Sequence, residues 1–218
     1  MKNLLSKIGK IADLSLLSEV QRKVVVANNS QRLFYAWVWT NLYLWLTNYI
    51  GNTEISLAGL LPNVMTIILK PVYDRNKKMF QNHLDILLIL DVVFNIIGGI
   101  LLAIGYAREG YILINILFNS IIQPLIDYSC INLNKYLFST VEEQNTYNEV
   151  YTPICSAANI IGYALSVSIA PIMPMLLKIT IFVLSGSLNS VFWLRILKDI
   201  GYYDKDKQKQ QEEQKEVA

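Results

Sequence analysis

The feature that most constrains this chain is the separation of its charged residues from six long apolar segments. The segments cover approximately residues 33–50, 55–72, 84–105, 111–133, 152–172 and 175–197. Each is close to the roughly 20 residues that an α-helix needs to cross a bilayer. A charge at the bilayer centre costs about 2.5–3.5 kcal/mol, so charged residues are expected mainly between such segments. The sequence therefore predicts an all-α, polytopic protein of the cell membrane with six transmembrane helices.

The composition agrees with a membrane location. Of the 218 residues, 53% are hydrophobic and only 17% are charged, whereas about 25% of the residues of a soluble domain are charged. The net charge of +2 gives no basic footprint, so we expect no nucleic-acid partner. The lipid bilayer is the expected environment and partner.

The positions of Lys and Arg predict the orientation of the helices. Of the 19 Lys and Arg residues, all except Arg108 and Lys178 lie in the N-terminal region, the second and fourth connections, or the C-terminal end. Cytoplasmic segments carry the excess of such residues in membrane proteins. Both termini are therefore expected in the cytoplasm, and this arrangement requires an even number of spans.

Three regions follow from this pattern. Residues 1–32 have Leu and Ile on one helical face and most of their Lys and Arg residues off it, which is typical of an amphipathic helix in the membrane interface. A helix packed on the cytoplasmic side of the bundle is the alternative. Residues 33–198 are expected to form the six-helix bundle, and residues 199–218 a polar cytoplasmic tail.

A stripe of polar residues interrupts the fourth segment. Asn115, Asn119, Gln123 and Asp127 recur at intervals of four, so a helix would place them on one face. Two interpretations remain open. The amides bond to neighbouring helices and hold the bundle together, or they line a water-filled cavity for a small polar solute.

Three further residues are candidates for such a cavity or for its coupling to protons. Asn41 and Asn159, in the first and fifth segments, are candidate lining residues. Asp91 lies deep in the third segment, and ionisable side chains inside membranes usually face a solute path or a partner. Asp91 is therefore our candidate for proton coupling.

The sequence contains no recognisable catalytic or metal-binding motif. We find no nucleophile motif, no zinc-ligand spacing and no phosphate-binding glycine loop. The chain has one histidine and two cysteines without CxxC spacing. We expect no enzymatic activity, no cofactor and no metal.

The second connection, KPVYDRNKK, resembles the loop between helices two and three of the major facilitator superfamily, which has the form GxxxDRxGRR. Asp74 and Arg75 match the motif, and Lys77 and Lys78 resemble its basic end. Lys70 and Lys77 stand where the motif has glycines, and the arginine motif of the family's fourth helix is absent. Gly162 and Pro171 are similar to the small-residue and proline-rich character of its fifth helix.

This resemblance implies one six-helix half of a transporter that is normally built from two such halves. Helices one, two, four and five would border the cavity, and Asp74 and Arg75 would form a cytoplasmic gate. The second half would come from a second copy in a homodimer or from a partner membrane subunit, unless the fold serves another purpose.

Two functions are therefore expected. The first is a transporter-like protein that binds or moves a small polar solute. The alternative is a non-transporting membrane protein, such as an accessory, immunity or substrate-binding subunit that acts through a membrane partner.

Overall fold

The computed structural model of this chain describes residues 13–131 and 133–204, and these residues form helices and turns without a strand. The long helices are α2 (Glu19–Leu46), α3 (Asn52–Arg75), α5 (Leu84–Ala103), α9 (Val141–Ser168) and α10 (Met175–Asp199). One further long rod consists of α6 (Ala107–Ile112), the π-helical segment η2 (Leu113–Ile122) and α7 (Gln123–Ile131). We call it the α6–α7 rod. The short elements are η1 (Leu14–Leu16), α4 (Lys77–Asn82), α8 (Asn134–Leu137) and η3 (Ala170–Ile172).

Five helical stretches in the described part of the chain are long and apolar enough to cross a membrane. They are Asn52–Arg75, Leu84–Ala103, Ala107–Cys130, Val141–Ser168 and Met175–Asp199. They coincide with the second to sixth predicted segments, although the fifth helix begins at Val141 rather than near residue 152. Most of the first predicted segment, residues 33–46, lies in α2, which ends at Leu46 and is not among these five.

Helix α2 is continuous across residue 32, where we expected the end of a separate amphipathic helix. Ser18 starts α2 with a capping box, in which its hydroxyl accepts from the Gln21 N–H and its own N–H donates to the Gln21 side chain. This reciprocal pair satisfies two free donors at the helix start. Residues 1–12 of the predicted amphipathic helix and residues 205–218 of the predicted tail lie outside the described residues.

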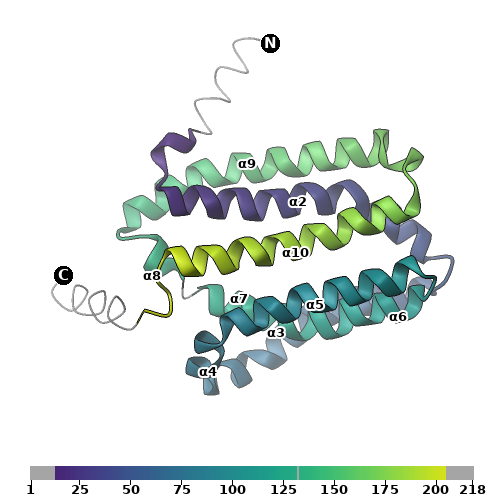
Figure 1. Cartoon of the computed structure of the whole chain (residues 1–218), viewed down its shortest axis with the longest axis horizontal. Helices are drawn as coiled ribbons and strands as arrows, with labels where there is room; N and C mark the ends of the chain where they lie inside the picture. Colours follow the sequence, from purple (N-terminus) through teal and green to yellow (C-terminus); the bar gives the residue numbers. More distant parts are fainter. Residues whose placement is uncertain (1–12, 132, 205–218) are drawn as a thin grey trace, which may run out of the picture.

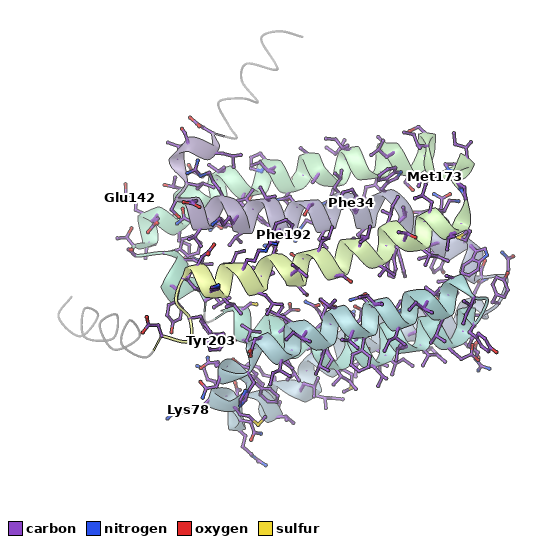
Figure 2. All side chains as sticks on the ribbon, in the orientation of Figure 1. Phe34, Lys78, Glu142, Met173, Phe192 and Tyr203 are labelled. Atoms are coloured by element: carbon purple, nitrogen blue, oxygen red, sulfur yellow. The ribbon has the colours of Figure 1, made fainter. Side chains whose placement is uncertain are left out.

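Successive long rods run in opposite directions, and Figure 1 shows them lying roughly along the horizontal axis of the picture. Lys78, Glu142 and Tyr203 lie at one end of the bundle, and Met173 lies at the other (Figure 2). We call the first the connection end, because the second and fourth connections lie there. Both ends of the described chain, near Leu14 and Asp204, also lie at the connection end (Figure 1).

The packing of the rods has an internal symmetry. Helix α2 packs against α9 and α10, and the α6–α7 rod packs against α3 and α5, while α10 and α5 pack against each other. If α2, α3 and α5 are exchanged for the α6–α7 rod, α9 and α10, respectively, the same pairs of rods remain in contact. We call these two sets of three rods the two units. Helix α2 and the α6–α7 rod, which begin the two units, run in opposite directions.

Gly162 permits a close approach of α9 to α2. A Cβ atom added to Gly162 would lie 2.6 Å from the Leu33 carbonyl oxygen and 2.7 Å from the Ala36 Cβ. Small residues allow helix backbones to approach closely in membrane proteins. The α2–α9 contact therefore depends on the absence of a side chain at this position.

We expect Gly162→Leu to separate α9 from α2 and to destabilise the protein by roughly 1–3 kcal/mol, as overpacking does. Thermal unfolding of the purified protein in detergent would measure the effect. Gly59→Ala is the matched control, because nothing lies within 4 Å of a Cβ atom added to Gly59. Equal unfolding temperatures for the two variants would contradict this packing.

Candidate functional site

Two adjoining cavities lie between α2 and the α6–α7 rod. The larger has a volume of about 600 Å³, and we call it the aromatic cavity. Its lining residues are Gln31, Tyr35, Trp39 and Tyr43 of α2, Ile55, Ser56, Gly59 and Pro62 of α3, and Tyr111, Asn115, Phe118, Asn119 and Gln123 of the α6–α7 rod. Three of the four predicted stripe residues therefore face the aromatic cavity.

The smaller cavity has a volume of about 280 Å³, and we call it the charged cavity. Its lining residues are Asn28, Gln31 and Arg32 of α2, Leu88 of α5, Gln123, Ile126, Asp127 and Cys130 of α7, Tyr151 of α9, and Asn189, Ser190 and Trp193 of α10. Gln31 and Gln123 line both cavities, so the two spaces meet at these amides. We refer to them together as the cleft.

The stripe residues bond along their own rod rather than to neighbouring helices. Asn115 Nδ2 donates to the Tyr111 carbonyl at 3.2 Å, and Asn119 Nδ2 donates to Asn115 Oδ1 at 3.0 Å. Gln123 Nε2 donates to Asp127 Oδ1 at 2.7 Å. These bonds do not join helices, so they favour a cavity lining over a role in holding the bundle together.

The π-helical geometry of η2 supports this alignment. In a π-helix the backbone bonds join residues five apart, and such segments occur frequently at functional sites. The hydroxyl of Ser120 donates to the carbonyl of Asn115, five residues earlier, at 2.7 Å. Asn115 and Asn119 both lie in this segment and line the aromatic cavity.

Asn41 and Asn159, the other two predicted cavity residues, do not line the cleft. Asn41 Nδ2 donates to the carbonyl and the hydroxyl of Ser166 at 3.1 and 3.2 Å, so it joins α2 to α9. Asn159 is half-buried on α9 and belongs to neither cavity. For Asn41, bonding between helices is the better interpretation.

Asp91 is buried between α5 and α10, with 4% of its surface exposed. One carboxylate oxygen accepts from the Asn95 amide and the other from the Ser190 hydroxyl. In the described residues no cationic side chain forms an ion pair with Asp91. Ser190 also lines the charged cavity, so a single hydroxyl connects Asp91 to the cleft.

The predicted gate residues lie at the connection end of α3. Asp74 forms an ion pair with Lys70, one turn earlier on the same helix, and Arg75 is exposed. The charge of Asp74 is therefore balanced within α3 rather than by another helix.

The resemblance predicted that helix one borders the cavity, but sequence reasoning did not identify the residues of α2 that line the cleft. Gln31, Tyr35, Trp39 and Tyr43 recur at intervals of four, as the stripe residues do. The signal was present, but three of these residues are aromatic and were attributed to an apolar span. Lys178 lies in α10, within the bounds predicted for the sixth segment, and is only 6% exposed.

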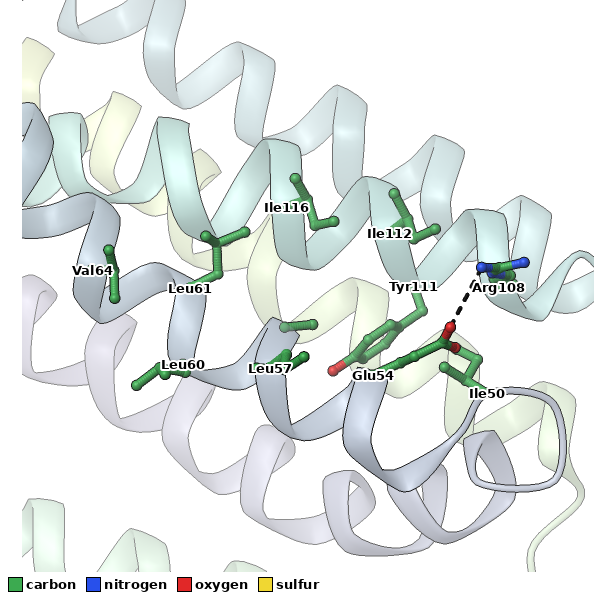
Figure 3. Close-up of a pocket in the computed structure, with 11 residues that line it drawn as sticks. Ile50, Glu54, Leu57, Leu60, Leu61, Val64, Arg108, Tyr111, Ile112 and Ile116 are labelled. Atoms are coloured by element: carbon green, nitrogen blue, oxygen red, sulfur yellow. Dashed lines mark ion pairs between the residues drawn. The ribbon is translucent and has the colours of Figure 1, made fainter.

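A third cavity, of about 470 Å³, lies between α3 and the start of the α6–α7 rod. Figure 3 shows that its walls are mainly Leu, Ile and Val side chains, with the Glu54–Arg108 ion pair at one end. The two charged groups are 3.5 Å apart and largely exposed. This apolar cavity offers few hydrogen-bonding groups to a polar solute, so the cleft is the better candidate site.

Comparisons with protein-family models, curated proteins and solved structures gave no match for this chain. The functional argument therefore depends on the cleft itself. In the described residues, no group of three or more His, Cys, Asp or Glu side chains has a geometry suited to a metal ion.

Proposed function

We propose that this protein is a multi-pass membrane transporter that binds and moves a small polar solute through the cleft. The observation that carries the proposal is the row of amides from Asn115 to Gln123. It faces a cavity of about 600 Å³, and its side-chain hydrogen bonds to the described residues stay within its own rod. Polar groups in a membrane are costly unless they serve a partner or a solute path.

The arrangement of the rods supports the resemblance to a major facilitator half. Each half of such a transporter contains two inverted three-helix repeats, and substrate sites lie at the interface between repeats. In this chain the cleft lies between α2 and the α6–α7 rod, which are the first helices of the two units. We assign the sixth membrane crossing to α2, because it packs against both α9 and α10 and its axis lies along theirs, in the direction of α9 and opposite to α10.

The charge distribution supports an orientation with the connection end in the cytoplasm. Lys70, Arg75, Lys77 and Lys78 lie at or near the end of α3, and Arg195 and Lys198 lie near the end of α10. These ends meet at the connection end (Figure 1). Such clustering is what the positive-inside rule requires of the cytoplasmic side.

A homodimer is the assembly that we propose. Only 6% of the most apolar stretch of α3 is buried, compared with 50% for Ala107–Cys130 and 22% for α9. Helices α3 and α9 correspond to each other in the two repeats, and both have large uncovered faces. A second copy against these faces would supply the half that a major facilitator transporter normally has.

Uptake by proteoliposomes tests the proposed function. We expect the purified protein to accumulate at least one solute from a panel of labelled amino acids, sugars and small organic ions, and native mass measurement to give two copies. Protein-free liposomes are the control. No uptake, together with a stable complex with a different membrane protein, would favour the accessory-subunit alternative.

A further inference from the structure

The charged cavity contains two opposite charges that do not pair with each other. Arg32 of α2 and Asp127 of α7 both line it. In the described residues, neither forms an ion pair within 4.0 Å, and Asp127 accepts a hydrogen bond from the neutral Gln123 amide at 2.7 Å. Both side chains are exposed, so a solute that enters this cavity can reach them. Two opposite charges that are accessible from one cavity suit a ligand that carries both signs.

A third group in this cavity also has an unused bonding capacity. The side-chain oxygen of Asn189 is buried and has no hydrogen-bond partner among the described residues, although Asn189 lines the charged cavity. A buried polar atom without a partner costs roughly 1–3 kcal/mol. If the Asn189 amide rotates toward the cavity, an ammonium group of a ligand gives this oxygen a donor while it also faces the carboxylate of Asp127.

The size of the two cavities restricts the ligand further. At about 280 Å³, the charged cavity lies just below the roughly 300–1,000 Å³ typical of ligand sites. It therefore suits a small head group. Beyond Gln31 and Gln123, the aromatic cavity presents Tyr35, Trp39, Tyr43 and Phe118, which suit an apolar or aromatic side chain.

We propose that the cleft binds a zwitterion of the α-amino acid type with an apolar or aromatic side chain. The carboxylate of the ligand binds the Arg32 guanidinium, whose planar donors match a carboxylate in a bidentate arrangement. Its ammonium group binds Asp127 and Asn189, and its side chain lies in the aromatic cavity. This inference rests on the proposed function and names the solute class of the same site.

Three related probes test the need for both charges. We expect L-phenylalanine to raise the unfolding temperature of the protein in phosphatidylcholine nanodiscs, and phenethylamine and 3-phenylpropionate to have little effect, because each lacks one charge. Equal effects of all three probes would overturn the inference.

Variants of the charged pair give a second, independent test. We expect Arg32→Gln and Asp127→Asn each to weaken phenylalanine binding about tenfold or more, as measured by calorimetry, because each removes one charge-assisted contact. Arg22→Gln is the matched control, since Arg22 is exposed on α2 and lines neither cavity. The ligand preference is also measured, because it does not depend on the stability of the variant. Arg32→Gln should bind phenethylamine at least as tightly as phenylalanine, and an unchanged preference for phenylalanine would contradict the assignment of Arg32.

A zwitterionic lipid head group has the same chemistry as an amino acid, so a further measurement distinguishes the two sources. We expect phosphatidylethanolamine in the nanodiscs to leave phenylalanine binding unchanged. Loss of phenylalanine binding on its addition would overturn the amino acid as the ligand. Uptake of a singly charged or neutral solute that requires Asn119 and Gln123 would refute this inference and leave the proposed function intact. Phenylalanine binding without uptake would support this inference and contradict the proposed transport function.

Discussion

Replacing Asn119 and Gln123 together by alanine is expected to lower solute uptake by proteoliposomes at least tenfold. Both amides face the cleft, and the structure shows no hydrogen bond to Asn119 Oδ1 or Gln123 Oε1 from the described residues, so both oxygens are available to a solute. A hydrogen bond to a bound ligand that carries a charge contributes roughly 1.5–3 kcal/mol. The loss of two such contacts accounts for the expected reduction.

The fold should tolerate this double substitution. The donors of Asn119 and Gln123 bond to Asn115 and Asp127 on the same rod, and no contact between helices is lost. Unfolding temperatures of the variant and the parent should therefore be similar. Asn63→Ala is the control, because Asn63 is an exposed amide of α3 that lines neither cavity. Undiminished uptake by the double variant would remove these residues from the site.

Asp91→Asn is expected to abolish the acceleration of uptake by an inward proton gradient while preserving solute binding. The carboxylate of Asp91 is buried, lacks a cationic partner in the described structure and is connected to the cleft by Ser190. A carboxyl group in this position can change its charge as the cleft opens to one side of the membrane and then to the other. An asparagine cannot, so uptake by the variant should not respond to the gradient.

Uptake measured at several imposed pH differences checks this expectation. Glu109→Gln is the control, since Glu109 is exposed near the start of the α6–α7 rod. Asp91→Leu should destabilise the protein, because it leaves the Asn95 amide and the Ser190 hydroxyl without their acceptor. Each buried group left in this way costs roughly 1–3 kcal/mol. A proton response in Asp91→Asn equal to that of the parent would exclude Asp91 from coupling.

The two functional hypotheses differ in what must occupy the uncovered faces of α3 and α9. A homodimeric transporter places a second copy there, and an accessory subunit places a different membrane protein there. The charged side chains of the cleft also distinguish the two hypotheses. A subunit that acts only through its partner has no need for Arg32 and Asp127 to line one cavity without pairing with each other.

Much of the helical framework could be predicted from hydrophobicity and length alone. Segments near 20 apolar residues must form helices in a bilayer, because helices satisfy their own backbone groups there. Five of the six predicted segments coincide with helices that are long and apolar enough to span. The bounds were less predictable, as α9 shows, because its first turns from Val141 are polar and carry no hydrophobic signal.

The sequence by itself determined that Asn115, Asn119 and Gln123 share one face, because helical periodicity depends only on the spacing of residues along the chain. Only the tertiary structure decided what that face meets. It placed Gln31, Tyr35, Trp39 and Tyr43 opposite the stripe. It also set Arg32 and Asp127 in one cavity and directed Asn41 toward Ser166. The physical reason is that these partners are distant in sequence, and the packing of whole helices brings them together. A local pattern can therefore identify a polar face but not the neighbour that completes a site.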